Sequence, residues 1–379
     1  IKKQSMMSFK IDFEFTIDLI GHFSIDGNSE YHDDLSQLKY YISPSNLNNV
    51  NFDLNKNYES TQHKSTSHIK LDHILKWISH NFRQLEKSLS VQEERWLDFD
   101  FICSRGLIKT ILSTPYINNE RNAWIICASK YRGTIYLCKF YTDEKEQKCL
   151  TASDYEKRAT SWGFKFEQYM LADHPSHAPN PERPLNECEE FYCMFKAKFN
   201  TYSLLYGAEI DGIFSRQLIK DTLVNKRFEV IELKTCPMNN INMYRKISRE
   251  RVSMWWSQNY LVNTDKIIFG LKDKKQKVRK INEYSVRELP YLSEEDYNTK
   301  VCKQFCKIFL DNVKRIVTKD HNECMYKFQW HPTAKDVVNY TEEPSDNERF
   351  FFLKPWFIAK AEEYRKSKRP QQIIKSNNK

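Results

Sequence analysis

Two acidic side chains in the stretch 204–214 have the spacing expected of ligands for a metal ion. Glu209 and Asp211 alternate with small and apolar residues in this segment. Successive side chains of a β-strand point to opposite faces, so a strand here puts both carboxylates on one face and the apolar residues on the other. We therefore predict one strand over 204–214 that carries a pair of converging carboxylates.

A second charged pair follows about twenty residues later, in the stretch 228–235. Glu232 and Lys234 alternate there with apolar residues, which again predicts a strand with one charged face. The polar segment between the two stretches has the composition of a connection that brings two strands back together. The two charged faces are then expected to meet, with three carboxylates and one lysine around a single point.

Three carboxylates and a lysine in this arrangement suit phosphodiester hydrolysis. Mg²⁺ and Mn²⁺ prefer oxygen ligands and retain water, so three carboxylates leave room for a substrate phosphate. A bound cation lowers the pKa of water, and a lysine two residues after a ligand is placed to position the nucleophile or to neutralise the phosphate. The order Asp, about twenty residues, then Glu-x-Lys resembles the PD-(D/E)XK nucleases. The alternative is a solvated strand face, on which Glu-x-Lys is common.

Three further residues are candidates for the site, and the first two also have a structural interpretation. Arg105 lies where a strand is expected to pass into a helix, a position suited to a phosphate and equally to capping a neighbouring element. Glu167 follows Gly163 by one turn of a predicted helix, so it is either a further ligand with clearance beside it or a surface glutamate. Gln258, on a helix predicted over 244–262, is able to reach a phosphate or the attacking water.

Composition and charge favour a folded protein with a polyanionic partner. The 379 residues are 40% hydrophobic and 29% charged, which supplies a core and excludes wholesale disorder. The net charge of +9 favours nucleic acid, although excess lysine is also common in other proteins. No apolar run approaches the roughly 18 residues of a membrane span, so we expect no membrane partner. The ten cysteines lack Cys-x-x-Cys and zinc-finger spacings, which favours a reducing compartment, nucleus or cytosol.

Five short motifs together resemble the DXO family of decapping exoribonucleases, and they occur in that family's order. The motifs are the Arg-Gly pair at 105–106, Trp-Gly-Phe-Lys-Phe-Glu (162–167), Glu-Ile-Asp-Gly (209–212), Glu-Leu-Lys (232–234) and Trp-Trp-Ser-Gln (255–258), which leads to Ile-Ile-Phe-Gly (267–270). The similarity covers roughly residues 15–360. All five motifs are intact, which argues against an inactive homologue.

The resemblance implies a role for each residue singled out above. The implied ligands of one or two Mg²⁺ or Mn²⁺ ions are Glu167, Glu209, Asp211, Glu232 and the carbonyl of Leu233. The implied catalytic residues are Glu209, which would hold water or a second ion, and Lys234 and Gln258, which would lie at the scissile phosphate. The implied substrate-binding residues are Arg105, Lys234 and Gln258.

The resemblance also implies an α/β fold of mixed α+β type, in one large domain with two β-sheets flanked by helices. The cleft of the active site is expected to open between the sheets. The expected boundaries are an N-terminal extension over 1–14, a catalytic domain over 15–360 and a basic tail over 361–379. Independently of the family, apolar residues at intervals of three and four predict an amphipathic helix over 68–90.

The function implied by the resemblance is metal-dependent hydrolysis at RNA 5′ ends in mRNA quality control. Family members remove incomplete caps or NAD by cutting the first internal phosphodiester, release pyrophosphate from 5′ triphosphates, and in some cases degrade RNA 5′→3′. The alternatives are a noncatalytic RNA-end partner or activator of a nuclear 5′→3′ exoribonuclease, and a DNA nuclease.

The implied partners are RNA 5′ ends bearing a triphosphate, an incomplete cap or NAD, and a nuclear 5′→3′ exoribonuclease. The implied location is the nucleus, with the cytoplasm as an additional location. The basic segment 365–370 is either a nuclear-import signal or a solubilising tail.

Overall fold

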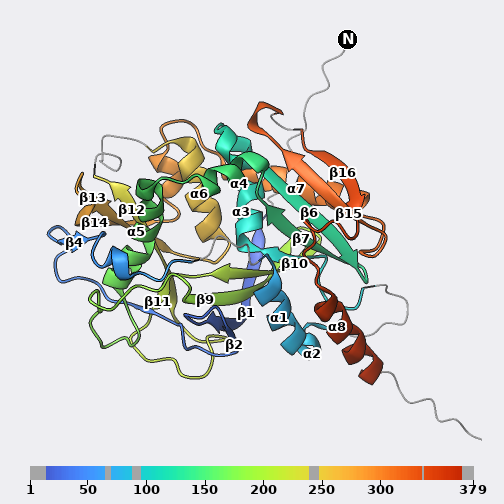
Figure 1. Cartoon of the computed structure of the whole chain (residues 1–379), viewed down its shortest axis with the longest axis horizontal. Coiled ribbons are helices and arrows are strands. Elements are labelled where there is room, and N and C mark those ends of the chain that lie inside the picture. Colours follow the sequence, from blue (N-terminus) through green and yellow to red (C-terminus); the bar gives the residue numbers. More distant parts are fainter. Residues whose placement is uncertain (1–13, 65–69, 88–94, 239–246, 335–336, 369–379) are drawn as a thin grey trace, which may run out of the picture.

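Two β-sheets with helices packed on both make up the part of the chain that the computed structural model describes, residues 14–64, 70–87, 95–238, 247–334 and 337–368 (Figure 1). The first sheet has nine strands in the order β16-β15-β6-β7-β5-β10-β9-β1-β2. Its strands are β1 (Phe15–Ile25), β2 (Tyr31–His32), β5 (Phe101–Ser104), β6 (Trp124–Tyr131), β7 (Thr134–Phe140), β9 (Glu190–Phe199), β10 (Tyr202–Glu209), β15 (Cys324–Trp330) and β16 (Asn339–Pro344).

The second sheet has seven strands in the order β4-β14-β13-β12-β11-β3-β8. Its strands are β3 (Tyr40–Tyr41), β4 (Phe52–Asp53), β8 (Leu171–Ala172), β11 (Gly212–Phe214), β12 (Glu229–Pro237), β13 (Lys266–Lys272) and β14 (Lys277–Ser285). The α-helices are α1 (Asp72–His80), α2 (Phe82–Leu85), α3 (Arg105–Ser113), α4 (Asp143–Leu150), α5 (Asp154–Met170), α6 (Arg249–Tyr260), α7 (Thr299–Ile316) and α8 (Pro355–Lys368). The mixed α+β fold with two sheets and flanking helices, as predicted, is confirmed.

Both faces of the nine-stranded sheet are covered, as the alternation along β5 shows. Phe101 points into the core that the sheet shares with α3, α6 and α7, whereas Ile102 points into the core under α1, α2 and α8. The seven-stranded sheet also packs against a different core on each face. Phe269 belongs to the first core, and the neighbouring Ile268 packs with Phe166 of α5 in a third. Helices α3 and α6 are in contact and lie in the middle of the molecule in Figure 1.

Three neighbouring strands of the first sheet run parallel and end at the same edge. Strand β5 pairs in parallel with β10 on one side and with β7 on the other. The carboxyl ends of parallel strands meet at one edge of a sheet, where side chains that follow them gather. Arg105 directly follows β5, Glu209 ends β10, and Lys139 is the penultimate residue of β7. The topology therefore brings these three charged residues to one edge.

The prediction of one continuous strand over 204–214 is wrong. Strand β10 stays in the nine-stranded sheet through Glu209, which pairs with Tyr192, and the chain then crosses to the seven-stranded sheet, where Gly212 pairs with Ile231. The backbone of Gly212 fits closely there, because a Cβ at this position would lie 2.8 Å from a methyl group of Leu171. Alternation of charged and apolar residues continues across this crossover, so the sequence pattern does not reveal it.

The helix predicted over 68–90 is two helices in its described part. Helix α1 ends at His80 and α2 begins at Phe82, because Asn81 has non-helical backbone angles and its side-chain amide donates to the carbonyl of Trp77 at 2.9 Å. The helix predicted over 244–262 is α6, which begins at Arg249. Positions 68–69, 88–90 and 244–246 lie outside the described residues.

The described part of the predicted basic tail, residues 361–368, continues helix α8. Ala361 is fully buried, and Glu362 forms an ion pair of 2.6 Å with Arg132. Residues 369–379, and residues 1–13 of the predicted N-terminal extension, lie outside the described ranges. None of the helices in the described part is both long enough and apolar enough to span a membrane.

Candidate functional site

The crossover between the sheets carries two of the predicted site residues. Glu209 is the last residue of β10, and Asp211 precedes the first residue of β11, so one short turn of chain delivers a carboxylate from each side of the junction. Both side chains are half-buried. Oδ2 of Asp211 accepts a hydrogen bond of 2.6 Å from the main-chain amide of Leu233 on β12. Asp211 is thereby fixed against the strand that carries the second charged pair.

The second charged pair lies on one face of β12, as its alternation predicted. Ile231 and Leu233 point into the core with α5, and the opposite face carries Glu232 and Lys234. The Glu232 side chain is 1% exposed and forms an ion pair with Nζ of Lys234. A buried carboxylate without a partner would be strongly unfavourable, so this pairing holds Glu232 ionised inside the protein.

Helix α5 brings the fourth carboxylate, Glu167. The helix begins with a capping box in which Ser153 and Glu156 satisfy each other's backbone amides. One residue before Glu167, the ring of Phe166 packs directly on β13 at Gly270, where a Cβ would lie 2.6 Å from the ring. Gly270 therefore allows α5 to approach the sheet closely enough for Glu167 to join the cluster.

Helices α3 and α6 supply the polar groups around Glu232. Ser104 caps the amino end of α3, and Nη1 of Arg105, the first helical residue, lies 3.7 Å from Oε2 of Glu232. From α6, Nε2 of Gln258 donates a hydrogen bond to Oε1 of Glu232. Nη1 of Arg105 is buried and has no hydrogen-bond partner within the described structure, so it is free to bind an oxygen of a ligand.

The carboxylates of this cluster repel one another. Burial, together with Asp211 and Glu209, raises the pKa of Glu167 well above its usual value. Burial, together with Glu190, raises the pKa of Glu209 to about 7. Burial, together with Glu232, raises the pKa of Asp211 to about 7. The cluster thus holds more negative charge than its own cations neutralise.

The pKa values of Glu232 and Lys234, in contrast, shift in the directions that favour their charged forms. Burial alone would raise the pKa of Glu232, but the charges of Lys234 and Arg105 more than offset this and lower it below its usual value. Burial alone would lower the pKa of Lys234, but Glu232 and Asp211 more than offset this and raise it. Both groups therefore stay charged at neutral pH, as a strong pair in a repelling cluster.

The donor set fits a hard divalent cation. It consists of carboxylate oxygens, which Mg²⁺ and Mn²⁺ prefer, and its mutual repulsion is relieved by added positive charge. As placed, no three His, Cys, Asp or Glu side chains of the described ranges are grouped tightly enough to hold one ion. The carboxylate of Glu232 accepts hydrogen bonds from Lys234 and Gln258, and the carboxylate of Asp211 accepts one from the amide of Leu233. Binding a cation would thus require side chains to rotate, and the Leu233 carbonyl as a ligand stays a prediction.

Sequence reasoning missed three charged residues beside the cluster. Glu190, which begins β9, raises the pKa of Glu209 and forms an ion pair with Lys64. Lys109 of α3 donates to Oε1 of Gln258 at 3.3 Å. A signal for Lys109 existed, because it follows Arg105 by four residues and so lies on the same face of a helix. The sequence held no comparable signal for Glu190 and Lys64, which lie far apart in the chain.

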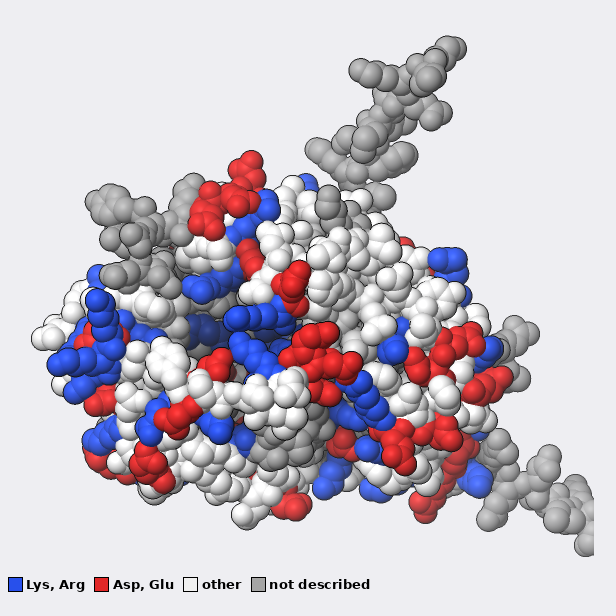
Figure 2. All heavy atoms as spheres, turned by 45° about the horizontal axis from the view of Figure 1, so that its top comes forward, with Lys and Arg blue, Asp and Glu red and all other residues white. Residues whose placement is uncertain are grey.

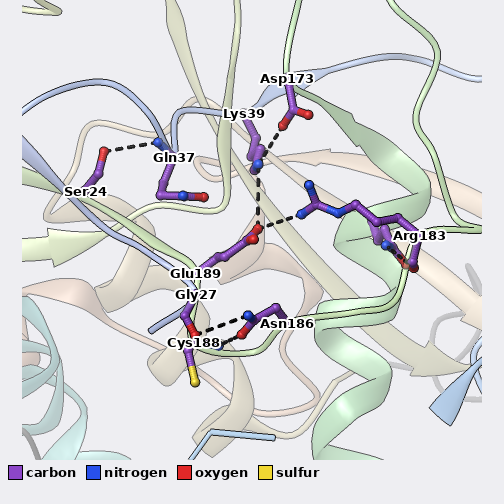
Figure 3. A network of polar contacts seen from close by, with 10 residues as sticks. Ser24, Gly27, Gln37, Lys39, Asp173, Arg183, Asn186, Cys188 and Glu189 are labelled. Carbon is purple, nitrogen blue, oxygen red and sulfur yellow. Dashed lines mark hydrogen bonds and ion pairs between the residues drawn. The ribbon is translucent and has the colours of Figure 1, made fainter. Parts of the chain in front are cut away.

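A pocket of about 300 Å³ opens beside Glu167, Glu209 and Asp211. Its far wall is a network of ion pairs in which the cations are already neutralised. Figure 3 shows Lys39 between Asp173 and Glu189, with Arg183 reaching the same glutamate. The distances are 2.6 Å from Lys39 to Asp173, 3.9 Å from Lys39 to Glu189 and 2.7 Å from Arg183 to Glu189.

Comparison with known proteins identifies the family of this chain. A family model described as "RAI1 like PD-(D/E)XK nuclease" matches residues 18–358. The decapping and exoribonuclease protein of Xenopus laevis is 28% identical over 350 residues, which cover 89% of this chain and 84% of the relative. The decapping and exoribonuclease protein Rai1 of Drosophila melanogaster is 30% identical over 304 residues, which cover 79% and 80%.

Solved structures agree on the fold. Rai1 of Scheffersomyces stipitis superposes with a TM-score of 0.75 at 17% identity, covering 93% of this chain and 97% of that one. Rai1 of Candida albicans gives the same TM-score at 19% identity, with coverages of 93% and 97%. The family resemblance and the nuclease assignment drawn from the sequence are confirmed. This chain belongs to the RAI1-like PD-(D/E)XK nuclease family.

Proposed function

We propose that this chain hydrolyses phosphodiester bonds at RNA 5′ ends with the help of Mg²⁺ or Mn²⁺. The observation that carries the proposal is the convergence of four carboxylates, Lys234 and Gln258 at the junction of the two sheets. The names of the relatives support RNA ends as substrate, since those of Xenopus and Drosophila are decapping and exoribonuclease proteins. The Candida albicans Rai1 structure contains pU5 and Mn²⁺, which supports a single-stranded RNA and a divalent cation.

In this proposal the carboxylates hold the cation and the cationic side chains hold the phosphate. Glu167, Asp211 and Glu232 would ligate the first ion, and Glu209 would hold a water molecule or a second ion. A bound cation would lower the pKa of water and stabilise the negative charge that develops on the phosphate. Four carboxylates are enough to bind either one ion or two. Their oxygen donors suit both Mg²⁺ and Mn²⁺.

The protein's own groups orient the scissile phosphate. Lys234 is held beside Glu232 and stays protonated, so it neutralises a phosphate oxygen rather than accepting a proton. Gln258 offers its amide nitrogen to the same position. Nη1 of Arg105, which lacks a hydrogen-bond partner among the described residues, is directed at the cluster and would donate to a second phosphate oxygen.

The proposed reaction is attack of water on the first internal phosphodiester of the RNA. The bond from that phosphorus to the 3′ oxygen of the first nucleotide breaks, so the cap leaves with its first nucleotide, or NAD leaves intact, and a 5′-monophosphate RNA remains. On a 5′ triphosphate the same site would release pyrophosphate. Repeated cutting would shorten the RNA 5′→3′, provided that each new end advances into the site.

The test is incubation of the purified protein with Mg²⁺ or Mn²⁺ and RNAs that carry a monophosphate, a triphosphate, an unmethylated cap or NAD. The proposal expects 5′-monophosphate RNA from at least one modified end and no product in EDTA. RNA binding without any product would instead support a noncatalytic partner of a nuclear 5′→3′ exoribonuclease. Equal cutting of matched DNA would support a general nuclease.

We also propose a location and a protein partner in the cell. We place the protein in the nucleus, with a nuclear 5′→3′ exoribonuclease as its protein partner. The basic residues that end α8, among them Lys366 and Lys368, are the part of the chain that supports nuclear import. A fluorescent fusion that stays cytoplasmic, or co-purification without any exonuclease, would contradict these two statements without touching the proposed reaction.

A further inference from the structure

Three lysines from separate elements form a second basic feature beside the site, which we name the lysine track: Lys109 of α3, Lys139 of β7 and Lys145 of α4. Nζ of Lys109 lies 3.3 Å from Oε1 of Gln258, Nζ of Lys139 lies 2.7 Å from Oγ1 of Thr110, and Nζ of Lys145 lies over the ring of Tyr141. Throughout the described ranges, none of the three forms an ion pair with an Asp or Glu side chain. The track begins at Gln258, which donates to Glu232.

The three lysines are half-buried, and their charges repel one another. Burial, together with the charges of Arg105 and Lys234, lowers the pKa of Lys109 to about 8. Burial, together with Lys145 and Lys109, lowers the pKa of Lys139 to about 7. Neighbouring cations that are partly buried and lack acidic partners destabilise the folded protein. A bound anion would relieve this repulsion.

Two sets of cations near the carboxylate cluster differ in their partners. In the pocket of about 300 Å³, Lys39 and Arg183 are paired with acidic groups. The cations of the lysine track lack acidic partners in the described structure. Figure 2 shows Lys and Arg side chains gathered in a hollow in the middle of one face of the molecule. A polyanion gains more from contact with cations that have no acidic partner.

We propose that the lysine track binds successive phosphates of the RNA body on the 3′ side of the scissile bond. The inference rests on the proposed function, because it assigns the path of the same substrate. The strand would leave the phosphate held by Lys234 and Gln258, pass Lys109 at the face of α3, and continue over the end of β7 to α4. The track would thus set the direction of the RNA in the site and favour substrates longer than a few nucleotides.

The test measures binding of 5′-monophosphorylated oligouridines of three and ten nucleotides, with Ca²⁺ in place of Mg²⁺ or Mn²⁺ and with RNA integrity checked on a gel. Lys139→Met and Lys145→Glu should each weaken binding of the longer RNA about fivefold or more and leave the trimer almost unchanged. For a single strand, the slope of log affinity against log salt should flatten by about 0.7 for each phosphate that the variant no longer neutralises. Lys360 lies on the exposed face of α8, so Lys360→Met removes one positive charge away from the track. This control should change the affinity for neither RNA.

Thermal unfolding separates this role from a structural one. Lys139→Met removes a half-buried charge and keeps the length of the side chain, so its Tm should equal or exceed that of the wild type. A lower Tm with unchanged affinity for the longer RNA would overturn the inference. Equal weakening for both RNAs, or the same weakening in Lys360→Met, would also overturn it.

The outcome is independent of whether the proposed reaction occurs. A wild-type preference for the longer RNA that disappears in the track variants supports the track even if no cleavage product is ever found. Product formation by a protein that binds both lengths equally leaves the proposed function intact and contradicts the track. Lys145 lies on a short surface helix, so its replacement by Glu should not disturb folding. The Lys145→Glu variant therefore still tests the track if Lys139→Met fails to fold.

Discussion

The main-chain amide of Leu233 donates a hydrogen bond of 2.6 Å to Oδ2 of Asp211. This bond joins the crossover between the sheets to β12, the strand that carries Glu232. It explains how a residue outside regular structure is held in place, since a strand amide rather than a mobile side chain fixes its orientation. The placement of Asp211 therefore depends on the pairing of β11 with β12.

Replacing Asp211 by Asn should abolish hydrolysis and stabilise the metal-free protein. The pKa of Asp211 is raised to about 7, so the group is mainly ionised at pH 8 and repels its neighbours. Asn keeps an oxygen for the amide of Leu233 and removes the charge. We expect a loss of at least about 100-fold in turnover and, in EDTA at pH 8, a Tm no lower than that of the wild type. Near-normal turnover would remove Asp211 from the proposed metal site.

Divalent cations should bind more weakly as the pH falls below 7. Glu209 and Asp211 each have a pKa of about 7, so below that pH protons compete with the cation for the same oxygens. Affinity should fall by roughly tenfold per pH unit for each proton displaced. Titration calorimetry with Mn²⁺ at pH 6 and pH 8 measures this. Equal affinity at both pH values would show that these carboxylates do not bind the ion.

Replacing Arg105 by Ala should weaken RNA binding more than cation binding. The guanidinium is 12% exposed, and its Nη1 faces the cluster without a hydrogen-bond partner in the described part of the chain. Losing a charged donor to phosphate should cost roughly tenfold in RNA affinity and flatten the salt dependence. An unchanged salt slope, measured beside Mn²⁺ affinity, would assign Arg105 to a structural role.

The contribution of Lys139 to stability should increase with pH. Burial, with Lys145 and Lys109, lowers its pKa from 10.5 to about 7, so between these values the unfolded chain holds a proton that the folded protein has released. Stability must then rise with pH across that window, by up to about 1.4 kcal/mol per pH unit. The free energy of unfolding of wild type relative to Lys139→Met should increase from pH 7 to pH 9. A constant difference would contradict the burial of this charge.

Local sequence patterns predicted the parts of the site that lie within one regular element. The alternation in 228–235 correctly placed Glu232 and Lys234 on one face of β12, because that strand is regular throughout. The strand-to-helix transition predicted at Arg105 is also present, with Ser104 as the cap of α3. The family motifs then supplied the fold, which composition alone does not specify.

The rest depended on contacts between distant segments. The crossover after Glu209 keeps the alternation of a single strand, so only the pairing partners reveal that two sheets are involved. Glu190 and Lys64 reach the cluster from strands and loops far away in sequence. The lysine track likewise arises because parallel strands end at one edge, which is a property of the topology and not of any local pattern.

If one carboxylate cluster performs the 5′-end chemistry, the species released from NAD-capped RNA will depend on that cluster. Mass spectrometry should detect intact NAD and 5′-monophosphate RNA with the wild type. It should detect neither with Glu232→Ala, whereas Glu342→Ala, which changes an exposed glutamate on β16, should behave as the wild type does. Release of NMN would show that a different bond is cut, and release of NAD that survives Glu232→Ala would show that this cluster does not perform the reaction.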